Sequence, residues 1–261
     1  MDVNLEETLI KVKNWAKEIG NFQYEKSKES NFAIDKKTSN VDLVTEIDKL
    51  SEKKIIKKIK NNFSSHSILA EEGGSVSKES PYTWIIDPLD GTNNYANGYP
   101  IYCVSIALEY KNEIILGSVF VPELNQLFWA TKGSGSYLNG KRLKVSKKDA
   151  LDQSLLATGF PYDKLTSKYN NMAHFQKMVM KARGIRRSGS AAFDLSSVAV
   201  GSIDGFWEFK LKPWDVAAAK IFIKEAGGKV IEETWDGVSL IVTGNSKICD
   251  EIYKTLKNVE I

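Results

Sequence analysis

The chain is poor in the residues that most often carry redox or zinc chemistry: two cysteines and two histidines among 261 residues. Cys103 and Cys249 are too few for a disulfide framework, so we expect both to be core thiols in a reducing compartment. His66 and His174 do not stand at zinc-ligand spacing, which argues against a zinc site. Gly-x-Ser-x-Gly, Walker A and Gly-x-Gly-x-x-Gly motifs are also missing. Their absence argues against a serine hydrolase, a P-loop NTPase and a dinucleotide enzyme.

Long apolar runs and a strong excess of one charge are missing too. No run approaches the ~20 residues that span a bilayer, and residues 1–7 are acidic, without the apolar core of a signal peptide. We therefore expect a cytoplasmic protein without a membrane partner. The net charge is only +3, so nucleic acid is not an expected partner. The length and the 42% hydrophobic composition suit one large domain or two packed subdomains.

The spacing of apolar residues predicts helices and strands in two patterns. In the first half, helices are predicted at about 5–22 (ending near Gly20) and 45–63, followed by strands at 67–70 and 82–86. Strands at 102–110, 113–121, 126–131 and 141–145 are then predicted to form an antiparallel meander. The second half alternates strands at 155–158, 185–187, 205–209, 229–231 and 239–242 with helices at 169–182, 191–200, 214–226 and 246–256. This change predicts a soft boundary near residues 146–153, with an α/β second half.

Carboxylates gather where predicted strands end and helices begin: Glu71, Asp87, Asp90 and Asp215. Asp87 and Asp90 directly follow an apolar strand, where carboxylates are costly unless something positive holds them. Gly91 and Thr92 then suit a turn into a helix N-terminus, whose free amides favour an anion. Carboxylates for a hard cation beside amides for an anion indicate a metal-assisted phosphate site, with Mg²⁺ as the metal. Taken alone, Asp215 also fits a helix N-cap and Glu71 a surface loop acid.

A second anion site is predicted where Gly189, Ser190 and Ala191 open an apolar helix, although an ordinary serine cap is the alternative. Arg186 and Arg187 precede it and could bind a phosphate or sugar hydroxyl, or could be surface charges.

Three signatures resemble the inositol monophosphatase family, within the Mg²⁺-dependent, Li⁺-sensitive phosphatases. They are residues 84–95 (WIIDPLDGTNNY), residues 214–219 (WDVAAA) leading to 225–228, and residues 42–48 (DLVTEID) followed by Glu71 and Glu72. They span most of the chain in family order. The resemblance implies a layered αβαβα sandwich of the inositol monophosphatase or sugar phosphatase type, with residues 1–261 forming a single such domain, and it implies a homodimer.

The resemblance also implies residue roles. Two to three Mg²⁺ ions would be held by Glu71, Asp87, the Leu89 carbonyl, Asp90 and Asp215, with Asp87 shared between two ions. Mn²⁺ would be an alternative metal, and Ca²⁺ and Li⁺ would inhibit. Thr92, oriented by Asp48, and Glu71 would position and deprotonate the attacking water. The substrate would meet Asp90, Gly91, Thr92, Arg187, Gly189, Ser190, Ala191 and Glu208. Asn97 stands where relatives often carry histidine, outside the metal ligands.

These observations predict an inositol-phosphate phosphatase, a hydrolase that splits inositol monophosphate or a similar small polyol phosphate by means of water. The same chemistry on fructose 1,6-bisphosphate, 3′-phosphoadenosine 5′-phosphate, histidinol phosphate or NADP is an alternative within the enzyme class. An alternative from another class is a metal-binding regulator of RNA or a protein partner, for which five lysines between residues 53 and 60 are the only support. They alternate with an apolar stripe, which favours a solvated helix face.

Overall fold

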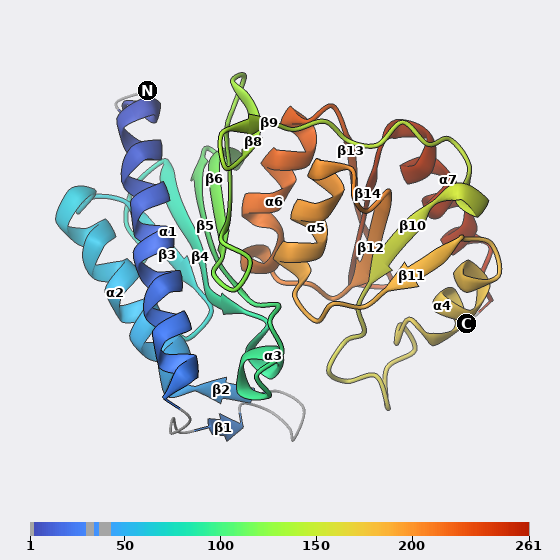
Figure 1. Ribbon diagram of the computed structural model, residues 1–261, viewed down its shortest axis with the longest axis horizontal. Coiled ribbons are helices and arrows are strands. Elements are labelled where there is room, and N and C mark those ends of the chain that lie inside the picture. Colours follow the sequence, from blue (N-terminus) through green and yellow to red (C-terminus); the bar gives the residue numbers. More distant parts are fainter. Residues whose placement is uncertain (1–2, 30–33, 37–42, 261) are drawn as a thin grey trace.

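The computed structural model describes residues 3–29, 34–36 and 43–260, so Asp42 of the third signature lies outside the described part. Helices alternate with two sheets in five layers (Figure 1). One apolar cluster lies between each sheet and its outer helices, and the largest fills the space between the two sheets, around the central helices. The predicted αβαβα sandwich is confirmed.

The seven-stranded sheet follows chain order, with β3 parallel to β4 and every later pair antiparallel. Its strands are β3 (Ser67–Ala70), β4 (Tyr82–Asp90), β5 (Cys103–Tyr110), β6 (Glu113–Val121), β7 (Gln126–Thr131), β8 (Gly135–Leu138) and β9 (Lys141–Arg142). The predicted meander is confirmed, but β8 was not expected and the strand predicted at 141–145 ends at Arg142. Beyond it the chain leaves the sheet, because the Val145 amide donates to the Ala226 carbonyl instead.

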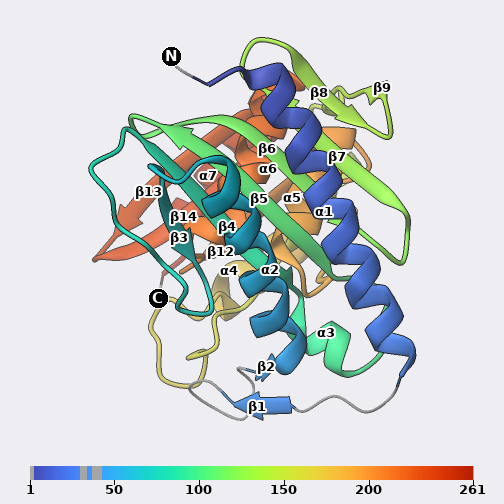
Figure 2. The ribbon, with the colours of Figure 1, turned by 90° about the vertical axis from the view of Figure 1, so that its left-hand side faces the viewer.

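Two helices, α1 (Leu5–Lys28) and α2 (Glu46–Asn62), cover the outer face of this sheet (Figure 2). The prediction that α1 stops near Gly20 is wrong. A Cβ at Gly20 would lie only 2.4 Å from Cδ1 of Phe120 on β6. The glycine therefore lets the helix approach the sheet closely, and does not end it. A short pair, β1 (Ile34–Lys36) and β2 (Leu43–Thr45), lies at the start of α2.

The five-stranded sheet has the order β11 (Gly184–Arg186), β10 (Leu155–Thr158), β12 (Gly205–Phe209), β14 (Val238–Gly244) and β13 (Lys229–Trp235). Strand β10 is parallel to both of its neighbours, whereas β14 is antiparallel to both of its own. Helices α5 (Ala191–Val200) and α6 (Pro213–Glu225) fill the space between the sheets. Helices α4 (Met172–Val179) and α7 (Ser246–Lys257) cover the other face. The helix predicted at 169–182 is therefore shorter than expected.

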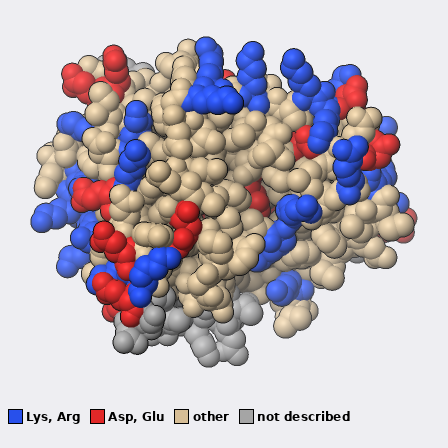
Figure 3. All heavy atoms as spheres, viewed as in Figure 1, with Lys and Arg blue, Asp and Glu red and all other residues tan. Residues whose placement is uncertain are grey.

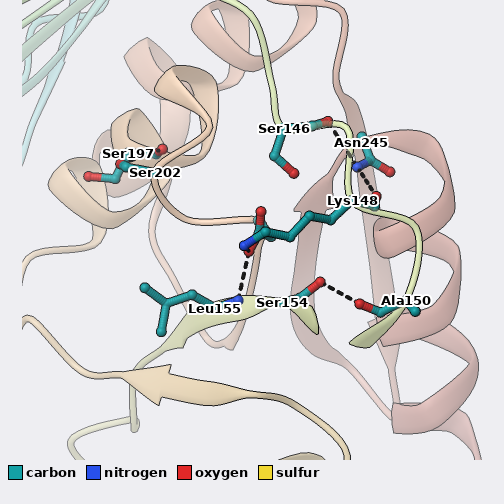
Figure 4. Close-up of polar contacts among 9 residues, drawn as sticks. Ser146, Lys148, Ala150, Ser154, Leu155, Ser197, Ser202 and Asn245 are labelled. Carbon is teal, nitrogen blue, oxygen red and sulfur yellow. Dashed lines mark hydrogen bonds and ion pairs between the residues drawn. The ribbon is translucent and has the colours of Figure 1, made fainter. Parts of the chain in front are cut away.

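The chain passes from one sheet to the other through residues 143–150, which are followed by the short 3₁₀ helix Leu151–Gln153. A buried carboxylate anchors this connection: Asp204 Oδ2 accepts from Lys148 Nζ at 2.8 Å and from the Leu155 amide at 2.7 Å (Figure 4). The Asn245 side chain donates to the Ser146 and Lys148 carbonyls. The predicted soft boundary at 146–153 falls on this connection, and a division into subdomains there stays a prediction.

Among the described helices, none combines the length and the apolar character that a membrane crossing requires. Cys103 and Cys249 are both buried free thiols, as predicted.

Candidate active site

The end of β4 delivers the central segment of the site. Asp87 is 1% exposed, and its Oδ1 accepts the Leu89 amide at 3.0 Å. The pairing with β5 shifts register between Asp87 and Asp90, so β4 bulges between the two acids while each of them still has a partner on β5. Gly91 follows with φ +95° and caps the short helix α3 (Thr92–Ala96). A Cβ at Gly91 would lie 2.9 Å from the Ile101 carbonyl oxygen, so this turn requires glycine.

Thr92 and Asp48 meet although 44 positions separate them in the chain. Thr92 Oγ1 lies 2.8 Å from Asp48 Oδ1 and 3.1 Å from the Leu89 carbonyl oxygen. The other Asp48 oxygen accepts from the Thr45 amide and hydroxyl at the start of α2. Burial raises the pKa of Asp48, and the hydrogen bonds from Thr45 and Thr92 oppose that rise. The capping box of α2 thus fixes the carboxylate that faces Thr92.

The four acids of the sequence analysis, Glu71, Asp87, Asp90 and Asp215, line one pocket of about 650 Å³. Burial is the main cause that raises the pKa of Asp87 well above its ordinary value. The charges of Glu71, Asp90 and Asp215 raise it further. The pKa of Asp215 is raised by burial and by the Asp90 charge. Such mutual repulsion makes the charged forms costly unless a cation enters.

The four carboxylates and the Leu89 carbonyl together suit a hard divalent cation, because such cations prefer oxygen ligands. In the described ranges no group of three or more His, Cys, Asp or Glu side chains is already arranged to hold a metal ion. A cation would therefore have to draw the pocket carboxylates closer together. Their raised pKa values favour this, since a cation in their midst removes the repulsion.

Asp215 combines the two interpretations that its sequence position left open. It is the third residue of α6, and its Oδ2 accepts the Lys212 amide at 2.7 Å, as in a capping box. It also lines the pocket. The helix start therefore orients a carboxylate that remains part of the site.

The predicted anion site at the start of α5 is partly filled by the protein itself. Asp90 Oδ2 accepts from Ser190 Oγ at 2.5 Å and from the Ala192 amide at 2.7 Å. Burial raises the pKa of Asp90 to about 6, with these hydrogen bonds opposing the rise. Gly189, Ser190 and Ala191 all line the pocket, where a substrate could reach them. Their contact with a substrate stays a prediction. The serine hydroxyl, however, is already engaged.

Glu208, on strand β12, lines the same pocket as the four acids. Its carboxylate lies over Gly159, where a Cβ would come 2.2 Å from Oε1. Burial, followed by the charges of Asp215 and Asp194, raises the pKa of Glu208 well above its ordinary value, and Arg187 opposes this. Arg187 lines the pocket, whereas the exposed Arg186 donates to the Ile185 carbonyl. The two arginines, which the sequence could not distinguish, thus have different surroundings.

Sequence reasoning missed several pocket residues. Asp194 is 4% exposed on the apolar helix α5, and burial raises its pKa to about 7. Its signal was a carboxylate on the buried face of an apolar helix. Other missed residues have no such signal, because the fold alone brings their loops to the pocket: Phe160, Tyr162, Asp163, Lys210 and Lys212.

Known proteins resemble this chain over most of its length. A sequence profile described as "Inositol monophosphatase family" matches residues 4–257. An inositol-1-monophosphatase of Synechocystis is 42% identical over 220 residues, which are 82% of this chain and 77% of the relative. A fructose-1,6-bisphosphatase/inositol-1-monophosphatase of Aquifex aeolicus is 40% identical, with 83% and 82% covered. A protein of Pseudomonas aeruginosa named Nus factor SuhB is 39% identical, with 83% of each covered.

The fold agrees with these likenesses. The solved structure of an inositol monophosphatase from Anabaena has a TM-score of 0.88 at 37% identity and covers 99% of this chain and 98% of its own. Members of the family depend on Mg²⁺, and the structure of one member, an IMPase/NADP phosphatase, is complexed with Mg²⁺ and phosphate. The chain therefore belongs to the inositol monophosphatase family.

Proposed function

We propose that this protein is a Mg²⁺-dependent phosphomonoesterase that releases inorganic phosphate from inositol monophosphate or a similar small polyol phosphate. The observation that carries the proposal is the buried Asp87 among three further carboxylates, beside the Thr92–Asp48 pair. Four clustered acids that repel one another only cost stability unless a cation uses them. The names of the relatives from Synechocystis and Aquifex support the reaction and the substrate class.

In this proposal the metal ligands are Glu71, Asp87, the Leu89 carbonyl, Asp90 and Asp215, which would hold two to three Mg²⁺ ions. When bound, Mg²⁺ supplies Lewis-acid neutralisation of the phosphate and lowers the pKa of water. The chain has its own part in proton transfer. Thr92 has a single hydroxyl proton, and Asp48 accepts it at 2.8 Å. The lone pairs of Thr92 Oγ1 are then available to accept from the attacking water, while Glu71 takes the water's proton.

The rest of the pocket would bind the substrate. The amides of Gly91 and Thr92, at a turn with φ +95°, would hold phosphate oxygens. Gly189, Ala191, Glu208 and Arg187 would meet the alcohol, with Glu208 as acceptor for hydroxyl groups. A second phosphate beside Glu208 would be repelled, so a neutral polyol is favoured over fructose 1,6-bisphosphate. We also propose a homodimer and a cytoplasmic location.

A panel assay tests the reaction. Purified protein is given Mg²⁺ and a set of phosphomonoesters, and phosphate release is measured with and without Li⁺. The panel includes myo-inositol 1-phosphate, fructose 1,6-bisphosphate, 3′-phosphoadenosine 5′-phosphate, histidinol phosphate and NADP. We expect the highest kcat/KM for the inositol ester and loss of release in excess EDTA. No release from any ester would overturn the proposal.

For a second function, binding of RNA or a protein partner, the support is the name Nus factor SuhB, which several relatives carry. The lysines of α2 do not add to it: Lys53, Lys54, Lys57 and Lys60 are exposed on the side away from the buried Ile55 and Ile59. Lys and Arg on the face drawn in Figure 3 are spread around its edge and mixed with Asp and Glu. RNA binding without phosphate release would favour this second function.

A further inference from the structure

A loop of the second half, residues 159–171, forms one wall of the pocket. Phe160, Tyr162 and Asp163 of this loop all line the cavity. Its two ends are fastened together, because Asn171 Nδ2 donates to the Gly159 carbonyl at 2.6 Å. The Asn171 oxygen accepts from the indole of Trp207 on β12 at 2.8 Å. The ends are therefore fixed at the sheet, while the middle of the loop extends outward to Leu165, which is 94% exposed.

Lys210 ties the middle of this loop to the end of β12. Its ammonium group donates to Asp163 Oδ2 at 2.5 Å and to Ser167 Oγ at 2.6 Å. The Lys210 amide donates to the Ser239 carbonyl on β14, so the backbone beneath the side chain is held as well. Lys210 has φ +64°, a left-handed conformation that favours glycine. A lysine in this conformation is strained, and such strain marks a position worth testing for function.

We propose that Lys210 is a positioning residue that fixes the loop wall against Glu208 and so sets the fit of the substrate's alcohol group. This proposal rests on the proposed function. Lys210 directly follows β12, two residues beyond Glu208, and Gly159, at the start of the loop, packs directly on the Glu208 carboxylate. The loop thus meets the end of β12 at two points near Glu208. Without the Lys210 clamp, the tie at Asp163 and Ser167 is lost, and the loop stays fixed at its ends and where Lys168 and Tyr169 contact Asp236.

The phosphate side of the pocket is built from other elements. Asp87 and Asp90 belong to β4, Thr92 to α3 and Asp215 to α6. Both hydrogen bonds of the Lys210 ammonium described above go to the loop. Loss of the clamp should therefore weaken the binding of a polyol and leave the phosphate chemistry largely intact.

Substitutions at both ends of the clamp test the proposal: Lys210→Met, Lys210→Gly and Asp163→Asn. We expect KM for myo-inositol 1-phosphate to rise about tenfold and kcat to fall less than about threefold, since the lost preorganisation concerns the alcohol. KM for phenyl phosphate, whose alcohol carries no further hydroxyl, should change less than about twofold. Lys210→Arg should restore the wild-type KM. Lys168→Met is the matched control, because Lys168 is a lysine of the same loop paired with Asp236 outside the pocket.

Chymotrypsin cleavage of the loop at Tyr162 and Leu165 gives a readout that needs no activity. The Lys210 and Asp163 variants should be cut several times faster than wild type at unchanged melting temperature. If wild type hydrolyses the inositol ester and the variants keep its KM, the positioning role is overturned while the proposed function stands. If wild type releases phosphate from no ester, the proposed function fails and the role that rests on it fails too. Equal cleavage rates would mean that the clamp does not hold the loop.

Discussion

Two buried aspartates, Asp204 at the connection between the sheets and Asp87 in the pocket, have the same exposure of 1% and opposite surroundings. Asp204 receives the Lys148 ammonium and the Leu155 amide. Asp87 Oδ1 accepts the Leu89 amide, and its carboxyl group faces three further carboxylates that raise its pKa. The fold thus neutralises one buried charge internally and leaves the other to an added cation. A buried acid that lacks a cation within the chain marks the functional region here, whereas burial alone does not.

Removing the charge of Asp87 should greatly reduce activity without reducing the stability of the metal-free protein, which is the largest effect that we predict. Asp87→Asn takes a shared ligand out of the metal site, so phosphate release should fall at least about 10³-fold. The same change relieves repulsion in the metal-free pocket, so the free energy of unfolding in EDTA should stay equal or rise. Steady-state kinetics and urea denaturation measure the two quantities. A variant with near wild-type turnover would place the reaction elsewhere.

Mg²⁺ should stabilise the protein through the pocket and not through the Asp204 region. A ligand at 100 times its Kd adds about 2.7 kcal/mol to the free energy of unfolding. We expect a stabilisation of this size in wild type and little of it in Asp215→Asn, which lacks one proposed ligand. Thermal denaturation with increasing Mg²⁺ measures the effect. An equal gain in both proteins would show that the ion binds outside the carboxylate pocket.

The Asp204 region should lose stability, with no change in activity, when the Lys148 side chain that neutralises Asp204 is removed. Lys148→Met leaves the Asp204 charge buried without its ammonium partner, which should cost about 2 kcal/mol of stability. The half-exposed lysine keeps this below the cost of breaking a fully buried pair. KM and kcat of the folded variant should not change, because Lys148 lies outside the pocket. Denaturation and kinetics on the same sample check both statements, and a changed KM would link the connection to the site.

The difference between the two aspartates was only partly readable in the sequence. The apolar strand before Asp87 and the Gly-Thr turn after Asp90 predicted a metal and phosphate site at residues 87–92. The pairing of Asp48 with Thr92 needed the resemblance. Nothing near Asp204 in the sequence indicated its partner, because Lys148 lies 56 positions away. Contacts of this range depend on how the sheets pack, and local patterns do not encode packing.

Errors in the fold have a similar origin. Gly20 was expected to end a helix, which is the ordinary local meaning of glycine near a helix C-terminus. It lies within α1 because Phe120 needs the space that a Cβ would fill. At the start of α5, where an anion site stays a prediction, the Asp90 carboxylate already accepts from Ser190 and Ala192. In both cases a distant residue satisfies the feature that the local sequence left open.

Asp194 is another buried acid of the pocket, and its effect on stability should depend on pH. Burial raises its pKa from 3.8 to about 7, so the folded protein favours the protonated form. The stability contributed by that form is complete below about pH 4 and is lost as the pH rises through 7. In metal-free protein, Asp194→Asn should therefore gain stability relative to wild type as the pH rises from about 4 to about 7. Denaturation curves across this range test it, and a constant difference at every pH would contradict the shift.

Substitution of the two neighbouring arginines at the end of β11 should give the smallest effect on KM, and the two positions can be compared directly. Arg187 lines the pocket and lowers the pKa values of Glu208 and Asp194, whereas Arg186 donates to its neighbouring carbonyl and is exposed. Arg187→Gln should raise KM for myo-inositol 1-phosphate about fivefold, the loss expected for one charge-assisted contact to the substrate. Arg186→Gln should change KM less than about twofold, because Arg186 is not among the residues that line the pocket. Equal effects of the two substitutions on KM would mean that the arginines act through the general field of the protein. A selective loss in Arg187→Gln would instead place a direct substrate contact on the alcohol side, opposite the carboxylates around Asp87.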